Sequence, residues 1–202
     1  MSDAERAVGT FWVFNLDWPL PRDLELFGSG EPTGSSIFAR LNVESAPTLA
    51  HAMGLADPAE VFQRLAGERR CYAILSESAP AAYGWVSFQE AYIGELGLRL
   101  HLEPGEAYIW DCATLPAFRR RHFYTALLIH ILRELRAEGL CRVWIGADAD
   151  NTISLRGIAR TGFLWVSELC VDPSGAKRLR GRPGVTDVLV DTTRRILLNE
   201  SV

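Results

Sequence analysis

The chain has 202 residues, of which 48% are hydrophobic, and a formal net charge of −4 at pH 7. This length and apolar content fit one domain with a full core and argue against a disordered chain. The negative charge gives no overall attraction to nucleic acid or to anionic membranes, and no apolar stretch approaches the roughly twenty residues that a membrane span needs.

The N-terminal third is predicted to contain a strand, a loop and two helices. A β-rich run predicts a strand over residues 10–16, and a segment rich in glycine, serine and proline predicts a loop over residues 28–36. Helical patterns cover residues 47–53 and 58–65. Asp57 is a suitable N-cap for the second helix, ahead of a proline at its first position.

The next four apolar runs are predicted to form a sheet. Residues 71–75 and 82–88 have the pattern of a strand pair, joined by a polar turn over residues 76–80. Runs over residues 96–102 and 107–114 are expected to extend this sheet across a Pro-Gly turn. All neighbouring strands up to this point are expected to be antiparallel.

A long helix follows, over residues 117–138, and Gly139 lies just beyond its end. Its apolar residues recur at helical spacing; they are Tyr124, Leu127, Leu128, Ile131, Leu132 and Leu135. The strand after it, over residues 142–147, completes a strand–helix–strand unit that should be right-handed and parallel. Parallel neighbours of this kind can splay apart.

The C-terminal part is predicted to add a short helix and two strands. Asn151 opens the helix, which ends near Gly162 and Phe163. Strands over residues 163–171 and 185–190 are expected to finish the sheet. The basic, glycine-rich segment over residues 177–184 is expected to be a hairpin loop on the surface.

The four cysteines indicate a reducing compartment. They lie far apart, mostly within apolar runs, and form no C-x-x-C pair; they are Cys71, Cys112, Cys141 and Cys170. We expect free, buried thiols, which fits a cytoplasmic protein. The first residues are acidic and polar and do not resemble a targeting segment. The histidines show no metal-type spacing, so no metal is expected.

Three consecutive arginines, Arg119, Arg120 and Arg121, stand where an apolar strand gives way to the long helix. The first turn of a helix offers unpaired N–H groups and the positive end of the macrodipole, so phosphate binds there readily. A solvated surface patch is the alternative. The start of the short helix, with Asn151 and Ser154, follows about thirty residues later. It favours the phosphate site, because two linked segments of this kind arise by chance less often than one arginine cluster.

These segments resemble the GNAT superfamily of acyl-CoA-dependent N-acyltransferases over roughly residues 106–171. The resemblance is carried by a hydrophobic-x-Pro turn, an aromatic residue, an Arg-x-x-Gly-x-Gly-type loop, an Asn-x-x-Ser start and a Gly-Phe pair. The matching residues are Thr114, Leu115 and Pro116 for the turn, Phe118, Arg119 at the start of the loop, Asn151, Ser154, Gly162 and Phe163.

The resemblance implies an α/β (α+β) fold of one domain, with a mixed and mostly antiparallel central sheet, a splayed parallel pair and flanking helices. It implies an N-terminal strand and helix extension over residues 1–70, an acyl-CoA-binding core over 71–171 and a C-terminal hairpin over 172–202. It also implies acetyl-CoA or another acyl-CoA as co-substrate. The implied pyrophosphate site consists of Arg119, Arg120, Arg121, His122, Phe123, Tyr124 and Thr125. The backbone of Cys112 and Thr114 is implied to bind the pantetheine arm, and Asn151 with Ser154 to support the cofactor side.

The sequence departs from the family pattern at three positions. His122 and Tyr124 stand where the loop usually has small residues, and Ile158 stands where many members have a tyrosine that protonates the departing thiolate. Bulky residues could narrow the cofactor cleft, because glycine lets the backbone approach a pyrophosphate closely. Alternatively, helical residues can present their N–H groups while the side chains point away. A thiolate can also leave without an acid, at a lower rate.

Two carboxylates are candidates for the catalytic base, Glu106 and Asp111. Glu106, Tyr108 and Trp110 share one face of the predicted strand, and Asp111 lies on the other face unless a β-bulge turns it. The alternatives are a buried, hydrogen-bonded carboxylate at Asp111 and a solvated turn residue at Glu106. His122 could be a base or a phosphate contact, although a surface role is the commoner one for such a residue.

The sequence thus predicts an N-acyltransferase that moves an acetyl or other acyl group to an amine of a small molecule or peptide. The alternative is a catalytically silent GNAT-fold module that binds CoA or another phosphorylated ligand. RNA binding through the arginines is disfavoured by the acidic balance, and no nucleic acid, membrane or metal is expected as a partner. A homodimer is left open.

Overall fold

The structure is a computed structural model, and it describes residues 5–21, 36–93 and 97–198. The loop expected over residues 28–36 lies outside these ranges except for its last residue. The elements of the first half are β1 (Arg6–Asn15), β2 (Ser36–Leu41), α2 (Ala46–Met53), α3 (Ala59–Ala66), β3 (Arg70–Ser76), β4 (Ala79–Ser87), β5 (Glu90–Ile93) and β6 (Leu98–His101). Those of the second half are β7 (Glu106–Thr114), α4 (Phe123–Ala137), β8 (Arg142–Asp148), α5 (Thr152–Arg160), β9 (Leu164–Val171), β10 (Lys177–Gly181) and α6 (Asp187–Leu198).

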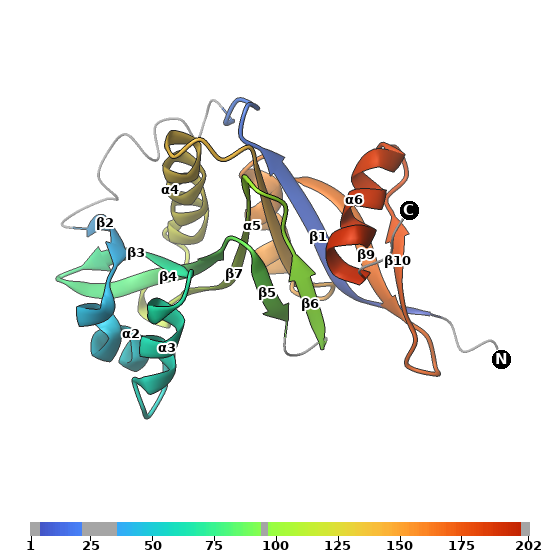
Figure 1. Cartoon of the computed structure of the whole chain (residues 1–202). Coiled ribbons are helices and arrows are strands. Elements are labelled where there is room, and N and C mark those ends of the chain that lie inside the picture. The colour runs from blue at the N-terminus through green and yellow to red at the C-terminus, as the bar shows by residue number, and fades with distance from the viewer. Residues whose placement is uncertain (1–4, 22–35, 94–96, 199–202) are drawn as a thin grey trace.

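The central sheet has eight strands in the order β10-β9-β1-β8-β7-β4-β3-β2 (Figure 1). All neighbouring pairs are antiparallel except β7 and β8, which are parallel. The first strand of the chain lies between β8 and β9, so the two ends of the chain both contribute to the same half of the sheet. The predicted fold class, a mixed and mostly antiparallel sheet with one parallel pair, is confirmed.

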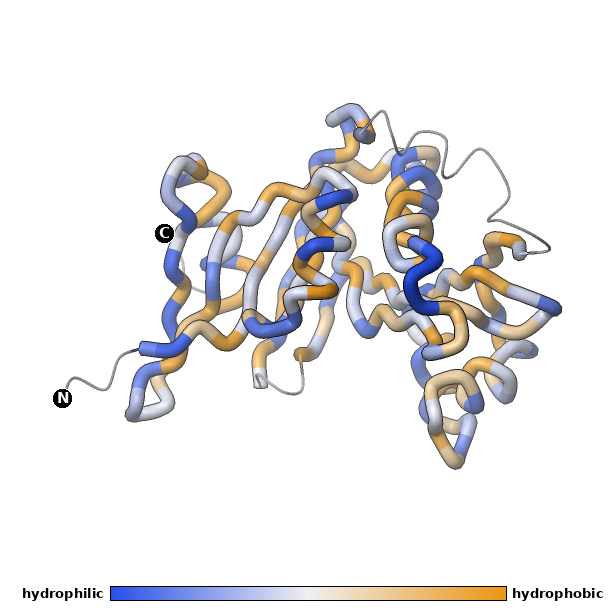
Figure 2. Tube along the Cα trace, turned by 180° about the vertical axis from the view of Figure 1, so that it is seen from behind, coloured by the Kyte–Doolittle hydropathy of each residue, from blue (hydrophilic) through white to orange (hydrophobic). Residues whose placement is uncertain are grey.

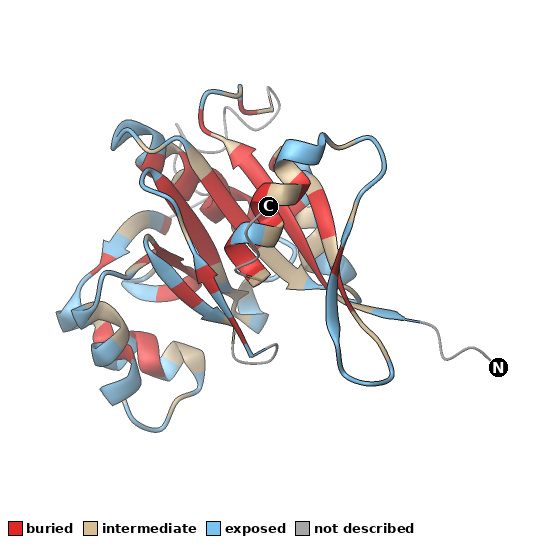
Figure 3. Ribbon diagram, turned by 45° about the vertical axis from the view of Figure 1, so that its right-hand side comes forward, coloured by how far each residue is buried: buried red, intermediate tan, exposed pale blue. Residues whose placement is uncertain are grey.

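Alternate residues of the strands face two sides of the sheet and pack under different elements. On one side, α4 and α5 cover Phe14, Ile109 and Ile145. On the other side, α6 and the β5–β6 hairpin cover residues such as Val13 and Trp144, while α2 and α3 cover the end of the sheet formed by β3 and β4. Figure 3 shows the buried residues concentrated between these layers and the exposed residues on the outer faces of the helices.

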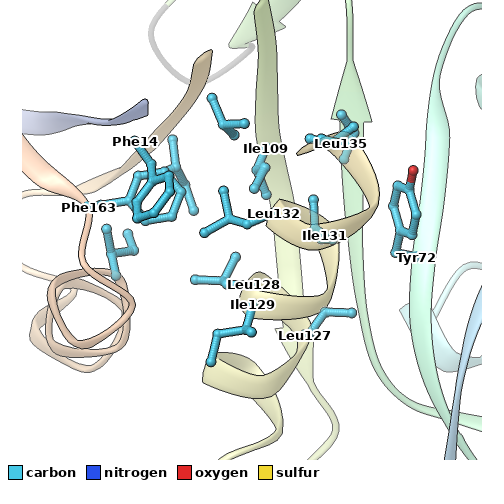
Figure 4. Close-up of a cluster of buried hydrophobic side chains, with 14 of the residues drawn as sticks. Phe14, Tyr72, Ile109, Leu127, Leu128, Ile129, Ile131, Leu132, Leu135 and Phe163 are labelled. Atoms are coloured by element: carbon cyan, nitrogen blue, oxygen red, sulfur yellow. The ribbon is translucent and has the colours of Figure 1, made fainter. Parts of the chain in front are cut away.

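The predicted apolar face of α4 is confirmed. Leu127, Leu128, Ile131, Leu132 and Leu135 are fully buried, and Figure 4 shows them spread between Phe14 and Phe163 on one side and Tyr72 on the other. Full burial of one such side chain contributes about 1.5–3 kcal/mol, so this face anchors the helix firmly to the sheet. The start of α4 is therefore held in place relative to β7 and β8.

The helix starts later than predicted. It begins at Phe123 and not at residue 117; Pro116–Phe118 form a separate 3-10 turn. Two residues ahead of α4 have left-handed backbone conformations, with φ of 64° at Arg120 and 60° at His122. Such conformations are incompatible with a continuous right-handed helix, so the arginines form a connection that leads into α4.

Two further predictions about the strands were wrong. The run over residues 96–102 does not extend the central sheet, because β6 pairs with β5 in a separate two-stranded hairpin. The C-terminal segment is also different from the predicted hairpin: the basic stretch forms strand β10, paired with β9, and the expected strand over residues 185–190 lies largely in α6. The apolar residues Val190, Ile196 and Leu197 all face the sheet at helical spacing, which explains the helix.

The second helix begins close to the predicted position. Its N-cap is Pro58 and not the predicted Asp57, although the Asp57 carboxylate accepts a hydrogen bond from the Ala59 N–H at 2.8 Å. None of the helices in the described part of the chain is both long and apolar enough to cross a membrane.

Candidate functional site

The parallel strands β7 and β8 separate halfway along their length. Their pairing begins at Glu106 and Arg142 and stops at Ile109 and Ile145, although β7 continues to Thr114 and β8 to Asp148. The second half of β7 therefore has a strand neighbour only on its β4 side. This opening is the splay that the sequence predicted, and it lies near the middle of the sheet (Figure 1).

A β-bulge on β7 lies at the opening. Tyr83 pairs with Ala113 and Trp85 with Trp110, so one residue of β4, Gly84, faces two residues of β7. Asp111, the first of these two, has a φ of 44°. Glycine at position 84 leaves room for the Cys112 side chain, because a Cβ there would come within 2.7 Å of the Cys112 Sγ and this side chain would have to move. The sequence predicted that Asp111 would lie on the face of β7 opposite to Tyr108 and Trp110 unless a β-bulge turned it. The structure contains such a bulge.

A cleft of about 640 Å³ extends through this region. Its floor is formed by β1, β7 and β8, from Thr10 and Tyr108 to Gly146. One end is bordered by α3, by Arg69 and by the β5 strand, and the other end by α4 and α5. We call these two ends the α3 end and the α4 end. The cleft thus joins the splayed strands to the start of α4.

Arg64 dominates the α3 end. Its guanidinium lies beside a stacked pair of indole rings, 5.3 Å from the centroid of Trp85 and 4.9 Å from that of Trp110. It donates hydrogen bonds to Asp111 at 2.5 Å and to Glu60 at 2.6 Å. Burial alone would lower the pKa of Arg64, but the bonds to Asp111 and Glu60 outweigh burial and raise this pKa above its ordinary value. Arg64 is thus a permanent cation. Asp111, which lies in the bulge, is its ion-pair partner.

The start of α4 offers an anion site at the other end. No side chain caps this helix, and the Ala126 N–H donates to the His122 carbonyl at 3.0 Å. The N–H groups of Phe123, Tyr124 and Thr125 precede that bond and have no carbonyl of the helix to bind. Figure 2 shows a strongly hydrophilic stretch leading into this end of the helix. The chemistry fits a phosphate group.

The arginines before α4 are all exposed. The Arg119 Nε donates to the Thr114 carbonyl at 3.4 Å, and the Arg121 guanidinium lies 5.6 Å from the ring centroid of Phe118. His122 is exposed too, with its Nδ1 3.4 Å from a guanidinium nitrogen of Arg160. Arg160 of α5 thus adds a further cation beside the three arginines of the loop, and the side chain of His122 is directed to α5.

Tyr124 points into the cleft from the first turn of α4. Its ring lies against Gly157 of α5, and its hydroxyl lies near the Ser154 side chain. Burial raises the pKa of this hydroxyl, so Tyr124 stays protonated and can act as a donor. The sequence left open whether the Tyr124 side chain would pack on the core or narrow the cofactor cleft. In the structure the Tyr124 ring packs on the core and also lines the cleft.

The short helix α5 begins as predicted, with Asn151 as its N-cap. The Asn151 Oδ1 accepts a hydrogen bond from the Ser154 N–H at 3.2 Å. Both residues line the cleft. Ile158, at the position where many GNAT members have a tyrosine, is fully buried in the core and does not reach the cleft.

Cys112 lines the cleft, whereas Thr114 does not. The Cys112 thiol lies 3.6 Å from the Trp110 carbonyl, and burial, followed by the charge of Asp111, raises its pKa above the ordinary range. This thiol is therefore neutral. The Thr114 hydroxyl is buried without a hydrogen-bond partner in the described part of the chain, while its carbonyl receives Arg119.

Glu106 lies away from the cleft. Its side chain is 4% exposed, and its carboxylate accepts hydrogen bonds from Arg142 at 2.8 Å and from the Trp144 indole at 3.0 Å. The structure therefore separates the two predicted candidates for the base. Asp111 lines the cleft, and Glu106 joins β7 to β8 where the two strands are still paired.

Three residues that no sequence motif indicated also line the cleft, namely Glu60, Arg64 and Arg69. All three come from α3 and the segment just after it, a part of the chain far from the motifs. A signal did exist, because α3 combines a charged face with an apolar one, but an amphipathic helix of this kind is also the normal pattern of a surface helix. Only the contact with Asp111, 47 positions away, makes Arg64 part of the site.

The comparisons with known proteins agree with this architecture. A sequence model described as the GNAT acetyltransferase family matches residues 45–163. No curated protein matches the chain. Among solved structures, a GNAT-family acetyltransferase from Colwellia psychrerythraea is 11% identical with a TM-score of 0.58; the match covers 84% of this chain and 56% of that one.

Two further solved structures are similar in fold. A protein from Novosphingobium aromaticivorans, described as a putative GNAT acetyltransferase, is 17% identical with a TM-score of 0.52, and the match covers 79% of this chain and 61% of that one. An aminoglycoside acetyltransferase from an uncultured soil metagenomic sample, in complex with trehalose, is 15% identical with a TM-score of 0.54; 78% of this chain and 100% of that one are covered. The chain therefore spans less than two thirds of the first two of these relatives.

Proposed function

Because this chain belongs to the GNAT acetyltransferase family, we propose that it is an N-acyltransferase that moves an acetyl or other acyl group from acyl-CoA to an amine. One observation carries the proposal: the splay between β7 and β8 opens into the same cleft as the start of α4. An extended chain with a phosphorylated end matches such a cleft, because strand edges bind amide groups and a helix start binds phosphate.

The residues present fit acyl-CoA. The N–H groups of Phe123, Tyr124 and Thr125 and the side chains of Arg119, Arg120 and Arg121 would bind the pyrophosphate. The unpaired edge of β7 at Cys112 would bind the amide groups of the pantetheine arm. When bound, acyl-CoA supplies an activated acyl group. The bulky residues at the two small positions of the loop do not occupy the helix N–H groups, since His122 is directed to α5 and Tyr124 to Gly157.

The chain's own residues supply the groups that an amine acceptor needs. Asp111 is the carboxylate of the cleft that borders both the splay and the α3 end, so we assign it the role of accepting the amine proton, directly or through water. Tyr124 and Ser154 provide hydroxyl donors at the α4 end. Glu106 keeps the strands together at the closed end of the splay, because its carboxylate is already engaged by Arg142 and Trp144.

The proposal is tested by titrating the purified protein with acetyl-CoA in a calorimeter, with desulfo-CoA as the control. Release of free thiol is then followed over a panel of small-molecule and peptide amines. We expect saturable binding and thiol release with part of the panel. Saturable binding with no thiol release would favour a silent CoA-binding module, and no binding at millimolar acetyl-CoA would contradict the proposed function.

A further inference from the structure

The α3 end of the cleft contains a charge pattern that the transfer of an acyl group does not itself require. Arg64 is bonded to two carboxylates, Glu60 and Asp111. One cation and two anions leave this cluster, which we call the Arg64 cluster, with a net negative charge. It therefore attracts the ammonium group of an incoming amine.

Arg69 lies beside this cluster with the opposite charge. Its guanidinium is 5.6 Å from the ring centroid of Trp110, and the Arg64 guanidinium lies over the same indole. Arg69 lines the cleft, and no carboxylate of the described residues comes within 4.0 Å of its nitrogens. An arginine held on an aromatic face keeps its planar set of N–H donors for a second partner.

Two other polar groups at this end are also without a bond in the described part of the chain. Gln63 of α3 and Tyr92 of β5 both line the cleft, and neither the Gln63 amide nor the Tyr92 hydroxyl makes a hydrogen bond there. The Tyr92 side chain is 59% exposed and stands at the edge of the cleft. The α3 end thus offers a cation, an amide and an aromatic hydroxyl around an aromatic floor.

We propose that the acceptor is an amine that carries a carboxylate a few bonds away, as in a free amino acid. The carboxylate would bind to Arg69, and the ammonium group would face the two carboxylates of the Arg64 cluster. The arrangement suits such a zwitterion, because two guanidinium groups lie on the same indole ring, and Arg64 is bonded to two carboxylates whereas Arg69 is bonded to none of the described ones. Arginine also suits this role, since its two parallel N–H donors match the two oxygens of a carboxylate.

A polycationic acceptor fits this end less well. At this end Arg69 would repel a second positive charge of such an acceptor. Because this inference names the acceptor of the transfer proposed above, it rests on that proposed function. A binding measurement keeps the two separable.

The first experiment measures binding without turnover. The protein is saturated with CoA and titrated with pairs of ligands that differ only in the carboxylate, namely free amino acids and their carboxamides. We expect at least one amino acid to bind about 10- to 100-fold more tightly than its amide, which is the range expected for hydrogen bonds to a charged group. Equal affinities for all pairs, or no binding of any amino acid, would overturn the inference.

Variants of Arg69 identify the group that reads the carboxylate. Arg69→Gln should abolish the difference between acid and amide, and Arg69→Lys should retain part of it, because lysine keeps the charge and loses the paired donors. The matched control is Arg182→Gln, since Arg182 also lies on an indole, 4.3 Å from the ring centroid of Trp165, but outside the cleft. An acid-to-amide preference that survives Arg69→Gln would overturn the assignment.

Thiol release with the same pairs separates the two proposals. Release that favours amino acids over their amides in kcat/KM supports both. Release with no preference between acid and amide overturns the acceptor inference and leaves the acyltransferase intact. Arg69-dependent binding of amino acids without any thiol release supports the acceptor site and contradicts the proposed reaction.

Discussion

The ring of Tyr124 lies directly against the backbone of Gly157. A methyl group at Gly157 would come within 2.6 Å of the Tyr124 Cδ1 and 2.8 Å of its Cε1. Tyr124 stands where the related phosphate loops have a small residue, and the missing side chain at position 157 makes the room that this large one needs. The contact also directs the Tyr124 hydroxyl to Ser154. The large side chain of Tyr124 on α4 therefore fits only because Gly157 on α5 has no side chain.

Replacing Gly157 with alanine should therefore disturb the junction of α4 and α5. We expect Gly157→Ala to lower the free energy of unfolding by about 1–3 kcal/mol, the range for overpacking, even though alanine is the better helix former. Chemical denaturation measures this loss. Gly67→Ala is the control, because its new Cβ would meet no atom closer than 3.8 Å. In the Tyr124→Ala background, Gly157→Ala should no longer lower the free energy of unfolding. An equal decrease in both backgrounds would contradict the proposed clash between the Tyr124 ring and a side chain at position 157.

The two outer arginines of the loop before α4 should contribute to the affinity for acyl-CoA. We expect the double variant Arg119→Ala and Arg121→Ala to raise the Kd for acetyl-CoA about tenfold at low salt, less at high salt, and to leave the melting temperature unchanged, because both side chains are exposed. Calorimetry measures the Kd. Arg6→Ala with Arg178→Ala removes the same charge from exposed positions outside the cleft. An equal loss of affinity in this control would indicate a general charge effect.

Asp111 should be needed for the chemical step. We expect Asp111→Asn to lower kcat by at least about 100-fold, the lower range for loss of general base catalysis. Asparagine tolerates the left-handed backbone at this position, so the bulge should persist. Glu60→Gln is the matched control, because it removes the other carboxylate bound to Arg64 and leaves Asp111 in place. Similar losses of kcat in the two variants would argue that Asp111 only positions Arg64.

Glu106 should be important for folding. We expect Glu106→Gln to lower the free energy of unfolding by about 1.5–3 kcal/mol, because the buried carboxylate accepts bonds from Arg142 and Trp144 and an amide replaces only part of them. The thiol-release kcat per folded molecule should stay the same. A kcat loss as large as that of Asp111→Asn, at unchanged stability, would return Glu106 to the list of candidate bases.

The four thiols should differ sharply in reactivity. Cys141 is exposed, whereas Cys71 and Cys170 are buried and burial raises the pKa of the Cys71 and Cys112 thiols. We expect a thiol reagent to modify Cys141 first in the native protein and all four cysteines after unfolding. Cys141→Ser should remove the fast phase, which also gives a cleaner background for thiol-release assays. A fast phase that persists in this variant would contradict the expected low reactivity of the other three thiols.

His130 should make stability depend on pH. Its ring stacks on Phe38, with centroids 4.4 Å apart, and burial lowers its pKa. The unfolded chain then binds the proton more readily, so the contribution of His130 is fully present above about pH 6.5 and is lost as the pH falls below that value. Denaturation at about pH 8 and pH 5 should show a smaller loss of stability in His130→Phe than in the wild type. Equal losses would rule out His130 as a source.

Local patterns were sufficient for much of the central unit. The helical spacing over α4, the parallel strands around it and the Asn151 cap all depend on neighbours a few residues apart, and all are present in the structure. The start of α4 was misplaced by six residues because apolar spacing does not report the left-handed residues at Arg120 and His122. The apolar run over residues 185–190 was assigned to a strand and not to a helix for a different reason, because short apolar runs fit both periods.

The sequence by itself determined the family resemblance, the parallel unit and the residues around the start of α4, because each of these is encoded by spacing within short segments. Only the tertiary structure decided which carboxylate reaches the cleft. The bulge at Asp111 depends on its pairing with β4 opposite Gly84, and the partner of Asp111 is Arg64 from a helix 47 positions earlier. Such contacts arise from long-range packing and charge pairing, which leave no periodic signal in the chain.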